Sequence, residues 1–496
     1  MRRGAAALVC ALVAGTALAG CGSDDADRTP SVPSSSTAAS TTPAPDDPEP
    51  AEPQAAPPAN LDLALSEPAE DSLYPDVGHP GVDALHYDLT LAWDPTTDTL
   101  TGDEVLTFRS TTDAPQFQLD LSDALEVTSV RIDDADAAFE HRGQDLVVDH
   151  PVTADERYAV SIRYRGTPEP AEAPTERSDF DGGLGFTIDD EHQVWTMQEP
   201  FGAFTYYAVN DHPSDKALYD FTLWTVDPMV GVANGAQVSD ERAGIARRTR
   251  YHLAEPAASY LVTIAFGDYT RTADTGPGGL PISYWTFADE PVPDSLFVSP
   301  DAIAWLEEKL GPYPFDTAGL LVVDSESAME TQTMVTLGNT SHALAESTIV
   351  HEYAHHWYGD QVTPNDWRDL WMNEGMAMYL EIVWTAERNG QDLDAAIADI
   401  APYEASYRAD DGPPGDFDPE NFASGGVYYS GAMLWHALRQ RIGDDDRFWE
   451  IVAGWPASRD NASSDRETLL AYLEQTTGDD LDEFWDAWLL GTTTPG

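Results

Sequence analysis

The sequence predicts an α+β protein of several domains, with an N-terminal all-β domain followed by a mainly helical domain. Between about residues 73 and 276, short β-rich runs alternate with turn signals, and no long helix is evident. After residue 276, longer segments carry apolar residues at helical spacing. A chain of 496 residues is long enough for two or three domains with substantial cores.

The composition is globular but strongly acidic. Hydrophobic residues make up 42%, whereas 25 basic residues face 88 acidic ones and give a net charge of −63. Such a charge repels nucleic acid and anionic lipid and favours solubility, so we expect no nucleic-acid partner. A solvated acidic surface is the favoured interpretation, and attraction of cationic peptides is the weaker alternative.

Residues 1–20 have the pattern of an export signal, with Arg2 and Arg3 before a short apolar core. Leu18-Ala19-Gly20-Cys21 resembles the lipobox of bacterial lipoproteins. The resemblance implies cleavage before Cys21, a lipid on its sulfur, and attachment to the extracytoplasmic side of the bacterial cell membrane. Plain secretion and an uncleaved signal are the alternatives. Since Cys10 is the only other cysteine, a chain cleaved before Cys21 has no internal disulfide.

Residues 21–72 are rich in Pro, Ser, Thr, Ala and acidic residues. A segment of this composition cannot bury a core, so we expect a disordered tether. In a fully extended polyproline form it would reach on the order of 150 Å.

The predicted elements of the folded part follow in chain order. In the β domain, the strand candidates are 86–93, 105–110, 157–165, 220–226 and 259–266. Beyond it, we expect strands at 283–287 and 319–323, and helices at 299–310, about 432–442, 448–453, 466–475 and 481–490.

The motif His351-Glu352-Tyr353-Ala354-His355 is H-E-x-x-H within a segment of helical periodicity. Histidines four apart lie one above the other on a helix, so His351 and His355 can hold one metal ion. Glu352 would project beside them, where a carboxylate can take a proton from water. The alternative is two ordinary core histidines beside a solvated Glu.

A catalytic zinc site of this kind needs a third ligand. The pattern H-E-x-x-H-x-x-G-x-x-H is excluded, because Tyr358 and Gln361 stand where it needs Gly and His. Asn373-Glu374-Gly375 instead lies near the start of a second helical stretch that runs to about Arg388. Three protein ligands leave one position for water, which is typical of a catalytic site. We therefore expect one Zn²⁺ per chain.

At these residues the chain resembles the M1 family of zinc aminopeptidases. That family carries H-E-x-x-H, eighteen intervening residues and a Glu inside N-E-G, and His355 to Glu374 has that spacing. The resemblance implies a β-saddle domain at 73–276 and a thermolysin-like, mainly helical catalytic domain at 277–496. It also implies a lipoprotein form that lacks the long C-terminal helical domain of many members.

The resemblance assigns further residues to the site. Glu199 and Glu330 match acids that bind the substrate's free amine. Ala328, Met329 and Glu330 fit the family's G-x-M-E-N strand, which binds peptide, but Ser327 replaces its Gly and Thr331 its Asn. Tyr428 matches the Tyr of Y-x-x-G-A, which hydrogen-bonds the tetrahedral intermediate, and Tyr429 falls on a variable position.

The function so implied is removal of N-terminal amino acids from peptides with a free N-terminus, with Glu352 as the base and Tyr428 as an oxyanion donor. Three alternatives stay open: a metallo-endopeptidase, another hydrolase on the same zinc fold such as an epoxide hydrolase, and a non-catalytic peptide-binding surface lipoprotein. Retention of Glu199, Glu330, Glu352 and Tyr428 argues for the aminopeptidase.

Overall fold

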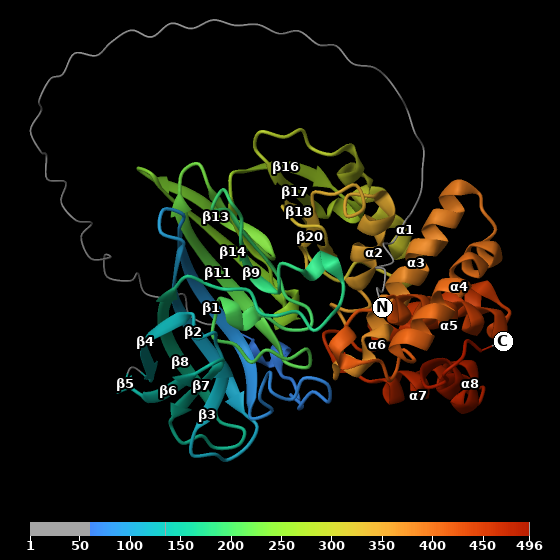
Figure 1. The fold of residues 1–496 in the computed structure, drawn as a ribbon, viewed down its shortest axis with the longest axis horizontal. Coiled ribbons are helices and arrows are strands. Elements are labelled where there is room, and N and C mark those ends of the chain that lie inside the picture. The colour runs from blue at the N-terminus through green and yellow to red at the C-terminus, as the bar shows by residue number, and fades with distance from the viewer. Residues whose placement is uncertain (1–59, 134, 496) are drawn as a thin grey trace, which may run out of the picture. The chain divides into compact units, whose positions relative to one another are not determined.

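The computed structural model describes residues 60–133 and 135–495, in which the strands precede most of the helices (Figure 1). The predicted export signal, the proposed lipidation site at Cys21 and most of the predicted tether lie outside the described residues. Within the described ranges, no helix combines the length and apolar character needed to cross a membrane.

The N-terminal part is built on an eight-stranded sheet in the order β13-β14-β11-β1-β2-β8-β4-β5. Neighbouring strands are antiparallel except β1 and β11, which run parallel. Strongly alternating burial along β8 shows a sheet with one face on the core. The predicted strands at 86–93, 105–110, 157–165 and 220–226 are confirmed within longer strands. The bounds are β1 Val82–Asp94, β2 Thr99–Ser110, β4 Leu125–Ile132, β5 Ala135–Asp136, β8 Arg157–Gly166, β11 Lys216–Val226, β13 Ala236–Ala243 and β14 Ala246–Ala258.

Two smaller sheets complete this part. Their orders are β12-β15-β10-β9 and β3-β7-β6. The predicted strand 259–266 is only partly correct, because Ser259–Leu261 forms the 3₁₀ turn η4 and the strand begins at Ile264. The carbonyl of Ser259 accepts a hydrogen bond from the Gln198 side chain instead of joining a ladder. The bounds are β3 Phe117–Asp120, β6 Ala138–Arg142, β7 Asp145–Asp149, β9 Gly185–Ile188, β10 Val194–Met197, β12 Val230–Ala233 and β15 Ile264–Gly267.

A five-stranded sheet, β16-β17-β18-β20-β19, introduces the C-terminal part. Its first two strands, β16 (Tyr269–Thr275) and β17 (Pro281–Phe287), form an antiparallel hairpin. The predicted domain boundary between residues 276 and 277 therefore falls inside this hairpin. The predicted strands at 283–287 and 319–323 are confirmed as β17 and β18. The remaining bounds are β18 Ala318–Val323, β19 Ala328–Met329 and β20 Val335–Gly338, with β21 Thr363–Pro364 and β22 Ser463–Ser464 as a separate short pair.

The helices follow the predicted order, with two differences. Helix α5 begins at Gly425, well before the predicted 432, because the Ser424 side chain accepts a hydrogen bond from the Gly426 amide and caps it. Helix α4 was not predicted as a helix of its own. The bounds are α1 Ser299–Leu310, α2 Glu346–His355, α3 Trp371–Asn389, α4 Leu393–Asp411, α5 Gly425–Ile442, α6 Asp445–Ser458, α7 Arg466–Thr477 and α8 Asp482–Leu489.

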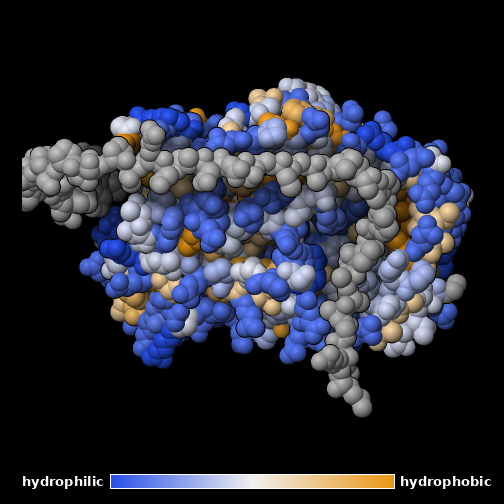
Figure 2. Space-filling view, turned by 45° about the horizontal axis from the view of Figure 1, so that its top comes forward, coloured by the Kyte–Doolittle hydropathy of each residue, from blue (hydrophilic) through white to orange (hydrophobic). Residues whose placement is uncertain are grey.

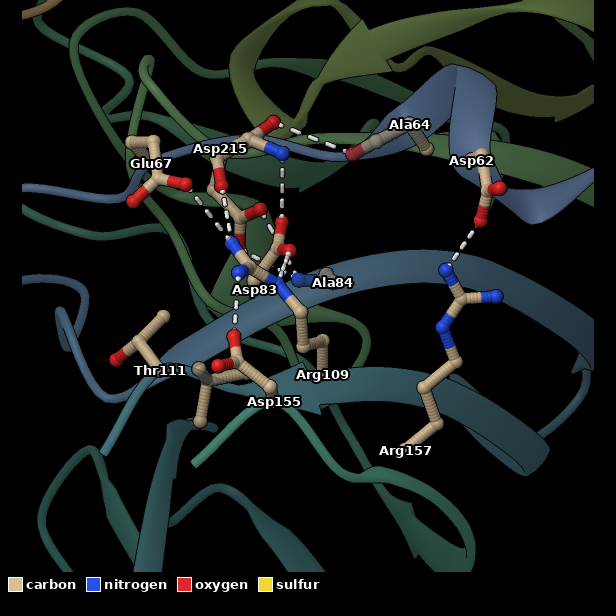
Figure 3. Close-up of polar contacts among 12 residues, drawn as sticks. Asp62, Ala64, Glu67, Asp83, Ala84, Arg109, Thr111, Asp155, Arg157 and Asp215 are labelled. Carbon is tan, nitrogen blue, oxygen red and sulfur yellow. Dashed lines mark hydrogen bonds and ion pairs between the residues drawn. The ribbon is translucent and has the colours of Figure 1, made fainter. Parts of the chain in front are cut away.

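The last part of the predicted tether is ordered, which corrects the prediction of disorder up to residue 72. Residues 60–72 begin with the 3₁₀ turn η1 (Leu61–Ala64), which packs against β1, β11 and β14. Figure 3 shows Arg109 beside this segment, where it pairs with the buried carboxylate of Asp83. Arg109 also donates to the backbone carbonyl of Ser66. Asp83 in turn accepts from the Ser66 amide at 3.0 Å. Composition alone did not reveal these specific side-chain contacts.

The same segment reaches the helical part. The buried Asp71 carboxylate accepts the Trp367 amide at 2.7 Å, and Asp366 accepts both the amide and the hydroxyl of Ser72. The N-terminal segment thus contacts both halves of the fold.

The face seen in Figure 2 is mainly hydrophilic, with hydrophobic residues scattered across it. This agrees with the large excess of acidic residues and with the solvated surface expected from the composition.

Candidate active site

The two histidines of the H-E-x-x-H motif lie one turn apart on α2 and face the start of α3. The Nε2 atoms of His351 and His355 lie 3.2 and 3.4 Å from the same Glu374 carboxylate oxygen. All three side chains are buried. Tetrahedral zinc with ligand bonds of about 2.0–2.1 Å separates its ligand atoms by roughly 3.3–3.4 Å. The donor set therefore fits a zinc ion in both chemistry and spacing.

The Nδ1 atoms of these two histidines, on the side of the ring away from Glu374, lie close to other protein oxygens. The Nδ1 atom of His351 lies 3.2 Å from a Glu381 carboxylate oxygen, and the Nδ1 atom of His355 lies 3.1 Å from the Tyr358 carbonyl. The hydrogen bond to the Tyr358 carbonyl fixes the tautomer of His355 that leaves Nε2 available to a metal, and the nearby charge of Glu381 favours the same tautomer of His351. Sequence reasoning missed Glu381, although its position two turns after Glu374 on the same helix was a usable signal.

Glu352 is buried beside the predicted ligands without belonging to their set. One carboxylate oxygen of Glu352 and one of Glu330 lie within 4.8 Å of each other and of a His355 ring nitrogen. Burial raises the pKa of the Glu352 carboxyl to about 8, against the opposing effect of the two histidines. A cation held at the neighbouring ligands would lower that pKa and favour the carboxylate that a general base requires.

Two further acids lie near this cluster, and each comes from a different half of the fold. Glu199 follows β10 and Glu330 follows β19, and their exposed fractions are 7% and 3%. The Oε1 atom of each has no hydrogen-bond partner in the described part of the chain. Burial, then repulsion from Glu330, raises the pKa of Glu199 well above its usual range. A buried carboxylate oxygen without a donor is an acceptor that a bound cation would satisfy.

The edge strand β19 carries the other predicted substrate-binding residues. Ala328 and Met329 pair with β20 on one side only, because β19 is the edge of its sheet. An open edge can accept an extended peptide as a further strand. Thr331 points inward and bonds to the Thr336 hydroxyl at 2.9 Å, so its side chain faces the core.

Tyr428, rather than Tyr429, is the tyrosine next to the predicted metal site. Its ring stacks against His351 with 6.0 Å between ring centres, whereas Tyr429 packs near Tyr403 and Tyr407. The Tyr428 hydroxyl lies 3.0 Å from Nη1 of Arg177, which comes from a loop of the β domain. The sequence held no signal for Arg177, because that loop shows no periodicity and is distant along the chain.

Glycines bring α3 and α5 together at this point. A Cβ added at Gly375 would lie 2.5 Å from the Cα of Gly431, and one added at Gly431 would lie 2.4 Å from the Cα of Gly375. Gly375 follows Glu374, and Gly431 lies one turn after Tyr428. The close crossing therefore places the third predicted ligand near the predicted oxyanion donor.

A helical H-E-x-x-H, a Glu ligand from the next helix and an adjacent edge strand define a metallopeptidase of the zinc type. The comparisons agree with this class. The model of the peptidase M1 N-terminal domain matches residues 83–261, and that of the peptidase family M1 domain matches residues 296–488. The chain belongs to peptidase family M1.

Relatives named as aminopeptidases match parts of the chain. Aminopeptidase N of Streptomyces lividans is 25% identical over an alignment of 333 residues, which covers 61% of this chain and 38% of that protein. Aminopeptidase N of Lactobacillus helveticus is 30% identical over an alignment of 268 residues, which covers 47% of this chain and 31% of that protein. The chain thus spans less than two fifths of the length of these relatives.

Solved structures match more completely. The M1 zinc metallopeptidase of Deinococcus radiodurans superposes with a TM-score of 0.77 at 25% identity, covering 86% of this chain and 98% of that one. A mutant of that enzyme bound to a Tyr-Ser-Ala substrate superposes with a TM-score of 0.78 at 24% identity. These matches confirm the fold class of an N-terminal β domain followed by a helical zinc-peptidase domain.

Proposed function

We propose that this protein is a zinc-dependent aminopeptidase, which removes the first residue from peptides with a free N-terminus. The observation that carries the proposal is the pair Glu199 and Glu330, whose buried Oε1 atoms have no protein donor in the described residues. They lie beside a His, His, Glu set that fits zinc. The aminopeptidase names of the relatives support the same activity.

When bound by His351, His355 and Glu374, zinc supplies a Lewis acid that polarises the scissile carbonyl and lowers the pKa of water. Glu352 accepts the proton of the attacking water and passes it to the leaving amine. Tyr428 donates a hydrogen bond to the carbonyl oxygen as negative charge develops there.

Glu199 and Glu330 fix which bond is cut. Both carboxylates would bind the α-ammonium of the substrate, while the peptide lies along β19 against Ala328 and Met329. A substrate without the ammonium leaves two buried carboxylates unpaired, which disfavours its binding. This selects the first peptide bond and argues against an endopeptidase.

The test compares free and N-acetylated aminoacyl-anilides. A charge-assisted contact contributes roughly 1.5–3 kcal/mol, so Glu330→Ala and Glu199→Ala should each lower kcat/KM about ten- to a hundredfold on the free amine. On acetylated substrates the loss should be much smaller, and zinc content should stay unchanged. The two losses should not add fully, since both acids hold one ammonium. If the wild-type protein cleaves both substrate classes equally well, the exopeptidase proposal fails and an endopeptidase replaces it.

We also propose that the protein is exported and anchored through a lipid on Cys21, on the extracytoplasmic side of the bacterial membrane. The support is the lipobox-like Leu18-Ala19-Gly20-Cys21 and the absence of any other cysteine after it. Mass spectrometry of the mature N-terminus tests this. An unmodified Cys21, or cleavage at another position, would refute the anchor and leave the peptidase proposal intact.

A further inference from the structure

A loop of the β domain lies against the predicted oxyanion donor. Residues 167–184 connect β8 to β9, and within this loop the Pro174 carbonyl accepts the Phe422 amide at 2.8 Å. Arg177 of the same loop reaches the first turn of α5 and donates from Nη1 to the Tyr428 hydroxyl at 3.0 Å. An element outside the metallopeptidase domain thus touches a predicted catalytic side chain.

The donors of Arg177 are almost fully used. Its Nε and Nη2 form a two-pronged pair with the Asp179 carboxylate, at 3.1 and 2.6 Å. Its Nη1 donates to the Ala423 carbonyl at 3.1 Å as well as to Tyr428. Four of its five N–H groups therefore have partners, which leaves little capacity to bind a carboxylate of the substrate.

Asp179 connects this pair to the substrate-binding strand. Its Oδ2 atom also accepts the Ser327 hydroxyl at 3.1 Å. Ser327 precedes Ala328, Met329 and Glu330 and replaces the glycine of the family pattern. A continuous set of hydrogen bonds therefore runs from Ser327 through Asp179 and Arg177 to Tyr428.

We propose that Arg177 is a positioning residue for Tyr428, oriented by Asp179 and Ser327. Because the Tyr428 oxygen accepts a hydrogen bond from Arg177, its own proton is directed to another acceptor, which is the carbonyl oxygen of the substrate. The adjacent positive charge also makes the phenol a stronger donor as that oxygen becomes negative. The inference rests on the proposed function, since it assigns a role to Arg177 only through Tyr428.

A double-mutant cycle tests the inference on a free aminoacyl-anilide. Arg177→Met should lower kcat about ten- to a hundredfold and change KM less than about threefold, because the contact acts in the transition state. In a Tyr428→Phe background, the same substitution should change kcat less than about threefold. Asp179→Asn should cause a smaller loss of kcat that also disappears in that background. Arg177→Lys, which keeps the charge without the fork, should recover part of the rate.

The controls separate positioning from a structural role. Arg163→Met removes a comparable pair, Arg163 with Asp103 on the strand surface, and should leave kcat unchanged. If Arg177→Met and Arg177→Lys lower kcat equally in both Tyr428 backgrounds, or alter only KM or the thermal midpoint, the inference is wrong. If Arg177→Met does not fold, the cycle run with Arg177→Lys and Asp179→Asn decides in the same way.

Failure of the proposed function gives a different result. A wild-type protein without activity on the free anilide removes the peptidase proposal itself. If the wild-type protein is active and Tyr428→Phe keeps a near-normal kcat, Tyr428 does not have the proposed role. The role of Arg177 is then excluded too, while the proposed peptidase activity is unaffected.

Discussion

Glu352 is the side chain on which proton transfer is predicted to depend. It is buried, follows His351 directly and is not one of the three predicted zinc ligands. Glu352→Gln preserves the shape and removes the base, so kcat should fall by about 10²–10⁴-fold while zinc stays bound. Elemental analysis together with turnover checks this. His355→Ala is the comparison, since it should lose both metal and activity; near-normal kcat in metal-loaded Glu352→Gln would exclude the role.

Glu381 contacts a predicted zinc ligand, His351, and is not itself a predicted ligand. Its carboxylate oxygen, 3.2 Å from Nδ1 of His351, orients the imidazole, and loss of such a contact typically weakens metal binding 10- to 100-fold. Glu381→Gln should therefore release zinc more readily in a competition titration with a chelator. The matched control is Glu387→Gln on the same helix, whose carboxylate pairs with Lys309 at the surface. Equal zinc affinity in the two variants would contradict the assignment.

At this scale, residue types and spacing predicted the ligand set, because one helical turn separates His351 from His355. Glu199, Glu330 and Tyr428 came from resemblance, and the structure places all three near the residues that fit zinc. Arg177 could not be predicted, because its contact with Tyr428 joins residues 251 positions apart. Such a contact depends on the path of a loop, which no local pattern specifies.

Among the elements, the crossing of α3 and α5 controls the geometry of the site. Gly431→Ala would place a Cβ 2.4 Å from the Gly375 backbone, which cannot move as a flexible side chain can. Overpacking of this kind typically costs about 1–3 kcal/mol, and separating the helices would also move Tyr428 away from Glu374. We expect a lower free energy of unfolding and a lower kcat.

The control for this crossing is Gly182→Ala, because nothing lies within 4 Å of a Cβ added there. Denaturant unfolding and kcat, measured on both variants, test the prediction. Unchanged stability and kcat in Gly431→Ala would show that the helices can separate without cost.

Element types were predictable where periodicity was strong, as in β2, β8 and α1. The start of α5 was not, since the capping by Ser424 lies in a stretch of glycine and tyrosine without a clear apolar period. The 3₁₀ turn η4 was also missed, because the side chain that contacts it, Gln198, lies about 60 residues earlier, directly after β10.

For the whole molecule, the segment before β1 joins the two halves. The Asp71 carboxylate accepts amides of Leu73 and Tyr74 from its own segment and of Trp367 from the helical part. Asp71→Ala leaves the buried Trp367 amide without its partner, and we expect a loss of about 1–3 kcal/mol in the free energy of unfolding. Asp76→Ala, at an exposed position nearby, should change little. Equal urea midpoints for the two variants would contradict this role.

The prediction of a tether ending at residue 72 was based on composition. Composition indicates how much apolar surface a segment can bury, but not which residues elsewhere in the chain form hydrogen bonds with it. Residues 60–72 bury little of their own, yet Asp83, Arg109 and Ser214 supply hydrogen bonds to their backbone. The segment is ordered by the sheet on which it lies.

That arrangement has a consequence for amide hydrogen exchange. The amides of Ser66 and Ala69 bond to side-chain oxygens of Asp83 and Ser214, outside any strand ladder, so local opening can expose them while the sheet stays intact. The amide of Ala84 also bonds to a side chain, that of Asp215, but both residues are buried and Ala84 lies within β1. Deuterium should therefore exchange early at Ser66 and Ala69, because only the segment before β1 has to detach to expose these amides. At Ala84, exchange should wait for the sheet itself to open.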